Sequence, residues 1–142
     1  MLGMGERALR LAARRARERT AFGRTLAENG ATMQTLGRCR VALEGARLAT
    51  LDAARRLDNE GNKAAKGAIA ACKVAAPRAA LEVIDAAIQI HGGLGVSDDA
   101  PLARMYAGAR TLRLADGPDE VCLLYTSPSP RDATLSRMPS SA

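Results

Sequence analysis

Apolar residues recur every three or four positions over four segments of the chain, with polar and charged residues between them. This spacing is typical of amphipathic α-helices, because it places the apolar side chains on one face of each helix. The sequence lacks the alternation of apolar and polar residues that is typical of a half-buried strand. We therefore predict an all-α fold, an antiparallel four-helix bundle. The predicted apolar stripes cover residues 4–16, 33–57, 69–90 and 102–112.

Glycines predict where these helices end. Gly61 and Asn62 separate the second stripe from the third, and three glycines within residues 92–95 separate the third from the fourth. Pro101 suits the first turn of the fourth helix. The polar residues before it are candidate N-caps: Ser97, Asp98 and Asp99.

Composition narrows the possible functions. A chain of 142 residues with 47% apolar residues is the size of one folded domain. Aromatic residues make up 2%, which argues against nucleic-acid binding by base stacking, and no apolar run approaches the roughly 20 residues of a membrane span. The three cysteines lie far apart and His91 is the single histidine, so we predict no metal site. Most catalysis that depends on a histidine is excluded unless His91 is itself the catalytic histidine.

Positive charge is concentrated near the start of the chain. The net charge is +6, and residues 1–24 contain seven arginines and two glutamates. Such a segment could meet phosphate groups, an anionic membrane surface or nucleic acid, and it is equally typical of a solvated helix face. Composition alone leaves these alternatives open.

The composition changes near residue 121. Residues 126–142 are rich in serine and proline and carry no apolar stripe, so they cannot bury enough surface to fold. We predict a folded domain over residues 1–121 and a tail over residues 122–142. The tail is either a native disordered segment or not native to the gene. The string LLYTSPSPRD…SRMPSSA resembles translated adapter sequence, which favours the second alternative.

Three segments together resemble one family, the acyl-CoA dehydrogenases. They are RTAFGRTL (19–26), AIQIHGGLGV (87–96) and LADGPDEV (114–121). The last of these, with KVAAPRA (73–79), resembles a subgroup in which some members carry a kinase-like domain upstream. The resemblance covers residues 3–121 and implies the C-terminal helical bundle domain of a longer enzyme. We therefore expect this chain to be a fragment that is inactive by itself.

The resemblance also implies an FAD cofactor and the residues that contact it. Arg19 matches the family arginine at the FAD pyrophosphate, and a guanidinium suits phosphate because its planar fork of donors meets two oxygens. Phe22 matches the phenylalanine at the adenine end. Gln89, Gly92 and Gly93 match the stretch along the adenosine half of FAD, often that of the adjoining subunit. Gly117 is assigned to the cofactor as well.

Asp116 is the predicted catalytic base. The usual family pattern is a glutamate followed by glycine, and Asp116 with Gly117 takes that place here. The reaction needs a carboxylate to remove the α-proton of an acyl-CoA thioester while a β-hydride passes to flavin, which yields trans-2-enoyl-CoA. The segment is also typical of a helix start, in which Asp116 caps and Asp119 and Glu120 face the helix N-terminus. Some family members carry the base on an upstream helix instead.

The resemblance implies partners as well. These are the acyl-CoA substrate, a second copy in a homodimer or homotetramer, and an electron-transfer flavoprotein. The implied location is cytoplasmic for a bacterial protein and mitochondrial or peroxisomal for a eukaryotic one. Two alternatives stay open: a basic helical bundle that binds a partner without catalysis, and a flavoenzyme of the same fold with a different reaction.

Overall fold

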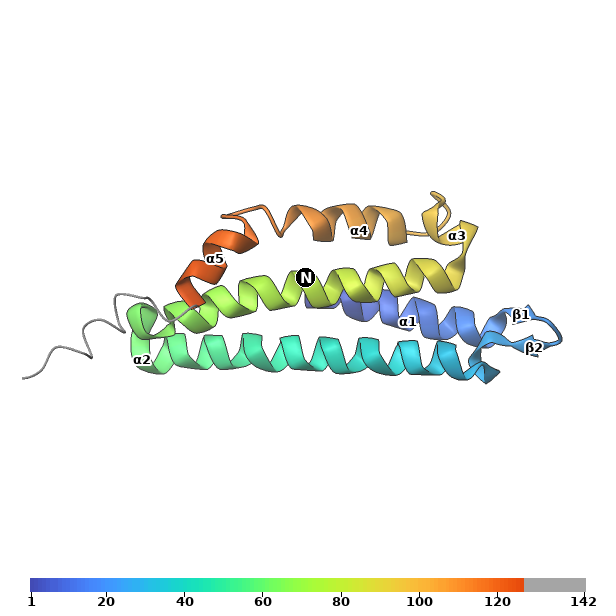
Figure 1. The fold of residues 1–142 in the computed structure, drawn as a ribbon, viewed down its shortest axis with the longest axis horizontal. Coiled ribbons are helices and arrows are strands. Elements are labelled where there is room, and N and C mark those ends of the chain that lie inside the picture. The colour runs from blue at the N-terminus through green and yellow to red at the C-terminus, as the bar shows by residue number, and fades with distance from the viewer. Residues whose placement is uncertain (127–142) are drawn as a thin grey trace, which may run out of the picture.

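The structure is a computed structural model that describes residues 1–126, and its helices lie side by side along one long axis (Figure 1). This confirms the predicted helical bundle. The elements in chain order are α1 (Leu2–Glu18), β1 (Thr20–Ala21), β2 (Arg24–Thr25), the 3₁₀ helix η1 (Leu26–Glu28), α2 (Gly30–His91), α3 (Gly93–Val96), α4 (Leu102–Thr111) and α5 (Asp119–Thr126).

The long α2 is two helices joined at Gly61. Gly61 has φ 80° and ψ 170°, which is not helical, and the chain reverses there. Figure 1 shows the two halves of α2 lying side by side, with α1 and α4 against them. The break falls where the sequence predicted it, because glycine adopts a positive φ at little steric cost.

The core lies where α1, both halves of α2 and α4 meet. Ile84 and Leu102 are fully buried at its centre. Gly5 allows α1 to approach closely, since a Cβ there would lie 2.6 Å from the Leu43 side chain and 3.3 Å from the Ala80 backbone. The other members of the cluster are small or aliphatic: Ala8, Leu9, Ala12, Cys39, Leu81, Val83, Ala87, Met105 and Ala109.

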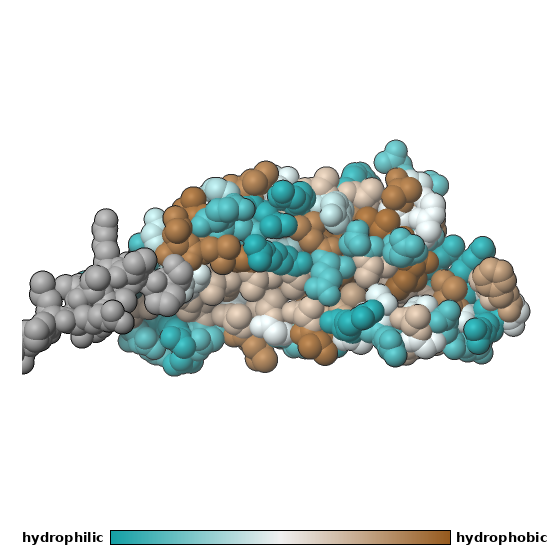
Figure 2. Space-filling model, in the orientation of Figure 1, coloured by the Kyte–Doolittle hydropathy of each residue, from teal (hydrophilic) through white to brown (hydrophobic). Residues whose placement is uncertain are grey.

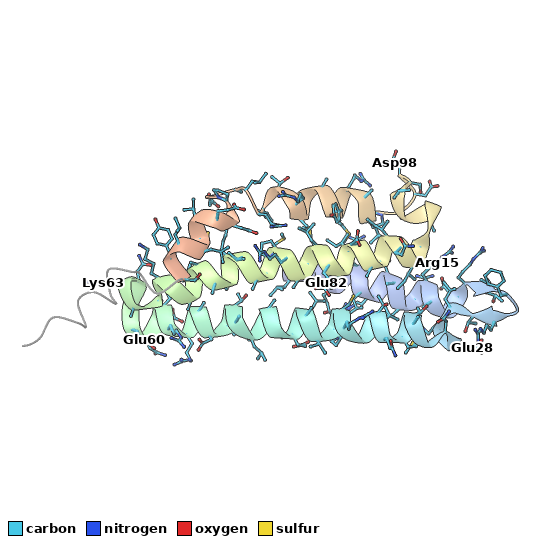
Figure 3. The ribbon with its side chains drawn as sticks, viewed as in Figure 1. Arg15, Glu28, Glu60, Lys63, Glu82 and Asp98 are labelled. Atoms are coloured by element: carbon cyan, nitrogen blue, oxygen red, sulfur yellow. The ribbon has the colours of Figure 1, made fainter. Side chains whose placement is uncertain are left out.

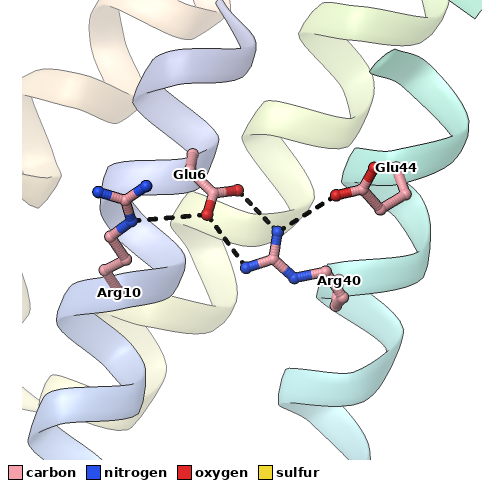
Figure 4. A network of polar contacts seen from close by, with 4 residues as sticks. All are labelled: Glu6, Arg10, Arg40 and Glu44. Carbon is pink, nitrogen blue, oxygen red and sulfur yellow. Dashed lines mark hydrogen bonds and ion pairs between the residues drawn. The ribbon is translucent and has the colours of Figure 1, made fainter. Parts of the chain in front are cut away.

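A polar network links α1 to the first half of α2 across this core (Figure 4). Arg40 donates to both carboxylate oxygens of Glu6, at 2.8 and 3.1 Å, and also lies 3.5 Å from Glu44. Arg10 lies 3.5 Å from Glu6 on the same helix. The hydrogen bond from Arg40 lowers the pKa of Glu6. Such partly exposed pairs contribute about 1 kcal/mol at most, so apolar burial provides most of the stability.

The second predicted stripe is buried only in its middle part. Met33 and Leu57, at its two ends, are exposed. The end near Leu57 is uncovered because α1 begins beside Thr50: Met1 and Thr50 line the same pocket, and Figure 1 places the N-terminus near the middle of the bundle. A stripe shows which face of a helix is apolar and not how far a neighbouring helix extends along it.

A short hairpin joins α1 to α2, although we predicted no strand. Thr20 pairs with Thr25 and Ala21 with Arg24. The turn between them holds Phe22 at φ 52° and Gly23 at φ 81°. Positive φ at both central residues is the pattern of a type I′ turn. Strands of two residues are too short to show an alternating pattern.

The predicted N-cap of the fourth helix is wrong. Helix α4 begins at Leu102, Pro101 stands in the N-cap position, and no side chain caps the helix. Ser97 instead closes the preceding turn, because its hydroxyl donates to the Leu94 carbonyl at 2.9 Å and accepts from the Asp99 N–H at 3.3 Å.

The described chain continues past the domain boundary that we placed at residue 121. Helix α5 extends to Thr126, and Cys122 is buried against Ala70 and Val74. Residues 127–142, which hold the rest of the predicted tail, lie outside the described residues. Among residues 1–126, no helix has the length and apolarity needed to cross a membrane.

Candidate functional site

The β1–β2 hairpin presents Arg19 and Phe22 at one end of the bundle. The backbone of Arg19 is fixed on both sides, because its N–H donates to the Arg15 carbonyl at 2.9 Å and its carbonyl accepts from the Leu26 N–H at 2.9 Å. Its side chain is exposed and makes no hydrogen bond or ion pair within residues 1–126. The guanidinium is therefore available to an anion.

Phe22 is the most unusual residue of this end. It is completely exposed, with a relative accessibility of 104%, and Figure 2 shows apolar surface at the hairpin end of the molecule. Its φ of 52° is a left-handed conformation that a bulky side chain rarely adopts. An exposed aromatic side chain on a strained backbone is typical of a residue kept for a ligand or partner.

The QIHGG segment ends α2 at the same end of the bundle. Gly92 has φ 65°, and its N–H donates to the carbonyls of Ile88 and Gln89. A Cβ added at Gly93 would meet nothing within 4 Å, so packing within the described chain does not require a glycine there. His91 is engaged with the backbone, since its Nδ1 lies 2.7 Å from the Ala87 carbonyl oxygen.

Two surface pockets show that these two segments are neighbours. Leu26 lines a pocket of about 270 Å³ together with Gln89. Arg15 and His91 line a second pocket of about 150 Å³. In Figure 3, Arg15 lies close to this end of the bundle. The structure thus places the two segments that hold five of the predicted cofactor residues at the same end of the bundle. These residues are Arg19, Phe22, Gln89, Gly92 and Gly93.

Asp116 lies elsewhere, in the loop between α4 and α5. Asp116 and Gly117 have φ 56° and 104°, so two consecutive residues are left-handed. Neither backbone N–H donates a hydrogen bond within residues 1–126. Asp116 lines a pocket of about 260 Å³ with Cys72 and Lys73 of α2. An acidic side chain and two unused N–H donors therefore share one turn.

Two groups that hold this loop were missed by sequence reasoning. Lys73 donates a hydrogen bond from Nζ to the Gly117 carbonyl. Asp119, which is 2% exposed, accepts from Arg113 Nε at 2.8 Å and from Arg78 Nε at 3.1 Å. Both Lys73 and Arg78 belong to the KVAAPRA segment that the resemblance had singled out, which was the available signal.

Asp119 is a charged anchor in a buried position. Burial raises its pKa, but the hydrogen bonds from Arg113 and Arg78 outweigh that effect, and the net pKa lies below its ordinary value. We predicted Asp119 as a residue facing the N-terminus of a helix. It does stand in the first turn of α5, and its carboxylate binds two arginines as well.

The structure does not bring Asp116 to the hairpin end. Pro77 lines the Asp116 pocket, and Gln89 lies farther along α2 by about 18 Å at a rise of 1.5 Å per residue. The predicted site residues therefore form two separate groups. Among residues 1–126, no cluster of histidine, cysteine or acidic side chains could hold a metal ion.

Comparison with known proteins identifies the family. The model of the acyl-CoA dehydrogenase C-terminal domain matches residues 1–126.

The chain belongs to the acyl-CoA dehydrogenase family.

Curated and solved members agree with this assignment. Acyl-CoA dehydrogenase family member 11 of Rattus norvegicus is 52% identical over 86% of this chain, and the probable acyl-CoA dehydrogenase IBR3 of Arabidopsis thaliana is 53% identical over 87%. The structure of butyryl-CoA dehydrogenase from Megasphaera elsdenii covers 96% of this chain with a TM-score of 0.82 and 30% identity.

These relatives are much longer than this chain. It spans 16% of the rat protein, 15% of the Arabidopsis protein and 34% of the solved butyryl-CoA dehydrogenase chain. Acyl-CoA dehydrogenases are FAD-dependent oxidoreductases, and the hairpin end has the donor set that such a cofactor needs. It offers the Arg19 guanidinium, which has no partner within residues 1–126, for phosphate, the exposed Phe22 ring for a nucleobase, and Gly93 for close approach.

Proposed function

We propose that this chain is the C-terminal domain of an FAD-dependent acyl-CoA dehydrogenase that oxidises acyl-CoA to trans-2-enoyl-CoA. The observation that carries the proposal is the Asp116–Gly117 turn. It presents a carboxylate beside a pocket, on a left-handed backbone tethered by Lys73, in the segment that resembles the family's base motif.

Asp116 acts as the general base in this proposal. A carboxylate oxygen of Asp116 takes the α-proton of the thioester. The unused N–H of Asp116 donates to the thioester carbonyl and stabilises the negative charge that develops on its oxygen. Aspartate is one methylene shorter than the usual glutamate, so the backbone of the turn must bring the carboxylate closer to the substrate.

The hairpin end binds the cofactor in this proposal. Arg19 holds the pyrophosphate, Phe22 stacks on the adenine, and Gln89 with Gly92 and Gly93 lies along the adenosine half. Gly117, beside the base, approaches the flavin end of the FAD that Asp116 faces. The chemistry that FAD supplies when bound is acceptance of a hydride from the β-carbon.

The separation of the two groups supports a shared cofactor. Pro77, which lines the Asp116 pocket, lies about 18 Å from Gln89 along α2, so we infer that Asp116 and Gln89 contact different parts of a cofactor. We propose that Asp116 faces the FAD of its own subunit, and that Arg19 and Phe22 reach the FAD of an adjoining copy in a homodimer or homotetramer. Electrons then pass to an electron-transfer flavoprotein.

The test uses the full-length enzyme that carries this domain. Asp116→Asn should retain FAD, seen as its visible absorbance, and should lose at least about 100-fold in the rate at which acyl-CoA bleaches the flavin under anaerobic conditions. Asp98→Asn is the matched control, because Asp98 is exposed and lies at the end of the bundle away from Asp116 (Figure 3). The flavin of this variant should bleach at the parent rate.

Two results would contradict the proposal. Bleaching of Asp116→Asn at the parent rate would place the base elsewhere. A full-length protein that purifies without flavin and binds DNA in a salt-sensitive way would favour the alternative of a basic interaction module.

A further inference from the structure

We propose that Lys73 and Asp119 are positioning residues that hold the Asp116–Gly117 turn in the conformation from which Asp116 reaches the substrate. This inference rests on the proposed function, because it concerns the geometry of the proposed base.

The backbone of this turn has an uncommon conformation. Asp116 has φ 56°, and for a residue with a side chain the left-handed region is less favourable than the extended or right-handed regions. Strained residues of this kind persist where the surrounding structure fixes them. The contacts that fix the turn are therefore part of whatever the turn does.

Lys73 provides the first of these contacts. Its Nζ donates to the Gly117 carbonyl, which joins the second half of α2 to the residue after the base. The Lys73 side chain is partly buried and lines the same pocket as Asp116. A charged donor on a packed helix fixes the direction of the Gly117 carbonyl, and with it the Gly117–Pro118 peptide plane, which begins at the residue after Asp116.

Asp119 provides the second contact, on the other side of the turn. Its Oδ2 accepts from Arg113 Nε at 2.8 Å, and Arg113 Nη2 lies 2.7 Å from the same oxygen. The Asp119 N–H donates to the Arg113 carbonyl at 3.2 Å, so the two ends of the loop are closed by backbone and side chain together. Arg78, on α2, donates to the same carboxylate at 3.1 Å and ties the closed loop to the bundle.

These contacts also separate the roles of the neighbouring acidic residues. The Asp119 carboxylate is buried and bound to two arginines, whereas Asp116 is exposed at the pocket. Glu120 is exposed on the first turn of α5. Asp119 is therefore an anchor and not a competing base.

The expected effect on catalysis is large because proton abstraction depends on placement. A displacement of about 1 Å can cost about 100-fold in rate. Losing one anchor should leave substrate and cofactor contacts at other residues intact, so the rate of flavin reduction should fall while acyl-CoA affinity changes little.

The test is a lysine series in the full-length holoenzyme. We expect Lys73→Met to lower the rate of flavin reduction per bound FAD by about 10- to 100-fold, with FAD content, acyl-CoA Kd and melting temperature close to the parent. Lys73→Arg keeps a charged donor and should recover most of the rate. Lys63→Met replaces an exposed lysine beside the Gly61 break in α2 (Figure 3); it is the matched control and should behave as the parent.

Asp119→Asn is a second, independent variant, with its exposed neighbour Glu120→Gln as control. Asp119→Asn should lower the rate of flavin reduction per bound FAD in the same way. If Lys73→Met does not give folded holoenzyme, Asp119→Asn tests the positioning role by the same criteria. A Lys73→Met enzyme at the parent rate would overturn the inference. So would a loss of activity that only follows the loss of bound FAD, because that is the signature of a structural role.

Asp116→Asn, measured in parallel, separates this inference from the proposed function. If Asp116→Asn is inactive while Lys73→Met is fully active, only the positioning role fails. If Asp116→Asn reduces its flavin at the parent rate, the proposed base fails and the positioning role fails with it.

Discussion

Phe22 gives the sharpest prediction, because stability and cofactor binding should respond to its replacement in opposite directions. Phe22 has φ 52° in a turn that needs positive φ, and its side chain is fully exposed. Asparagine tolerates the left-handed region better than phenylalanine, and Asn-Gly is the preferred pair for this turn. Phe22→Asn should therefore relieve strain without removing any buried contact.

The size of the effect follows from these two observations. A left-handed residue other than glycine costs about 1–3 kcal/mol, of which asparagine should relieve about 1 kcal/mol. For a domain of this size, that free energy corresponds to a rise of about 4 °C in Tm. Urea or thermal unfolding of this chain measures it. Phe22→Tyr keeps the aromatic ring and the strain, so its Tm should equal that of the parent.

Cofactor binding should move the other way in the full-length enzyme. Stacking of an aromatic side chain on a base contributes about 1–3 kcal/mol, so Phe22→Asn should weaken FAD binding by about 5- to 150-fold, while Phe22→Tyr should retain it. An Asn variant no more stable than the parent would refute the strain argument. Unchanged FAD affinity in that variant would refute the stacking role.

Three further predictions concern other parts of the bundle. Gly95→Ala should destabilise the domain by about 1–3 kcal/mol in urea unfolding, because its Cβ would lie 2.7 Å from the Ile88 carbonyl oxygen. At Gly93 a Cβ would lie in open space, so Gly93→Ala should leave stability unchanged and should weaken FAD retention. Arg19→Ala should lower FAD affinity in equilibrium dialysis with little change in Tm, and equal affinity would contradict its assignment. The pKa of Asp119 is lowered in the folded state, so the ionised Asp119 should stabilise the fold fully above about pH 4. This stabilisation should disappear as the pH falls through the folded pKa. A free energy of unfolding that does not fall in acid would contradict the arginine contacts.

Much of the fold was predictable from local pattern. The spacing of apolar residues identified the main helices, and Gly61 identified the reversal within α2, because both signals depend on residues close in the sequence. The QIHGG segment was also placed correctly at the end of a helix. Gly92 follows the last residue of α2 with a positive φ, a conformation that glycine adopts readily.

The hairpin shows where local pattern fails. Each strand has two residues, and the turn places a phenylalanine in a conformation that its own preference disfavours. The two-residue turn of the hairpin needs positive φ at both central residues, whatever the preference of the residue that stands there. The polar residues before α4 were wrongly assigned as caps because Ser97 bonds to the preceding turn and Pro101 takes the N-cap position.

By itself, the sequence determined which segments are helical and where they break, and it named the residues that we propose carry the chemistry of the family. Only the tertiary structure decided how those residues are grouped. It placed Asp116 away from the hairpin and joined the next residue, Gly117, to Lys73, which lies 44 positions before Gly117 in the chain. Contacts over such distances depend on how the helices pack, and that packing is set by the sum of many weak apolar contacts that no single segment contains.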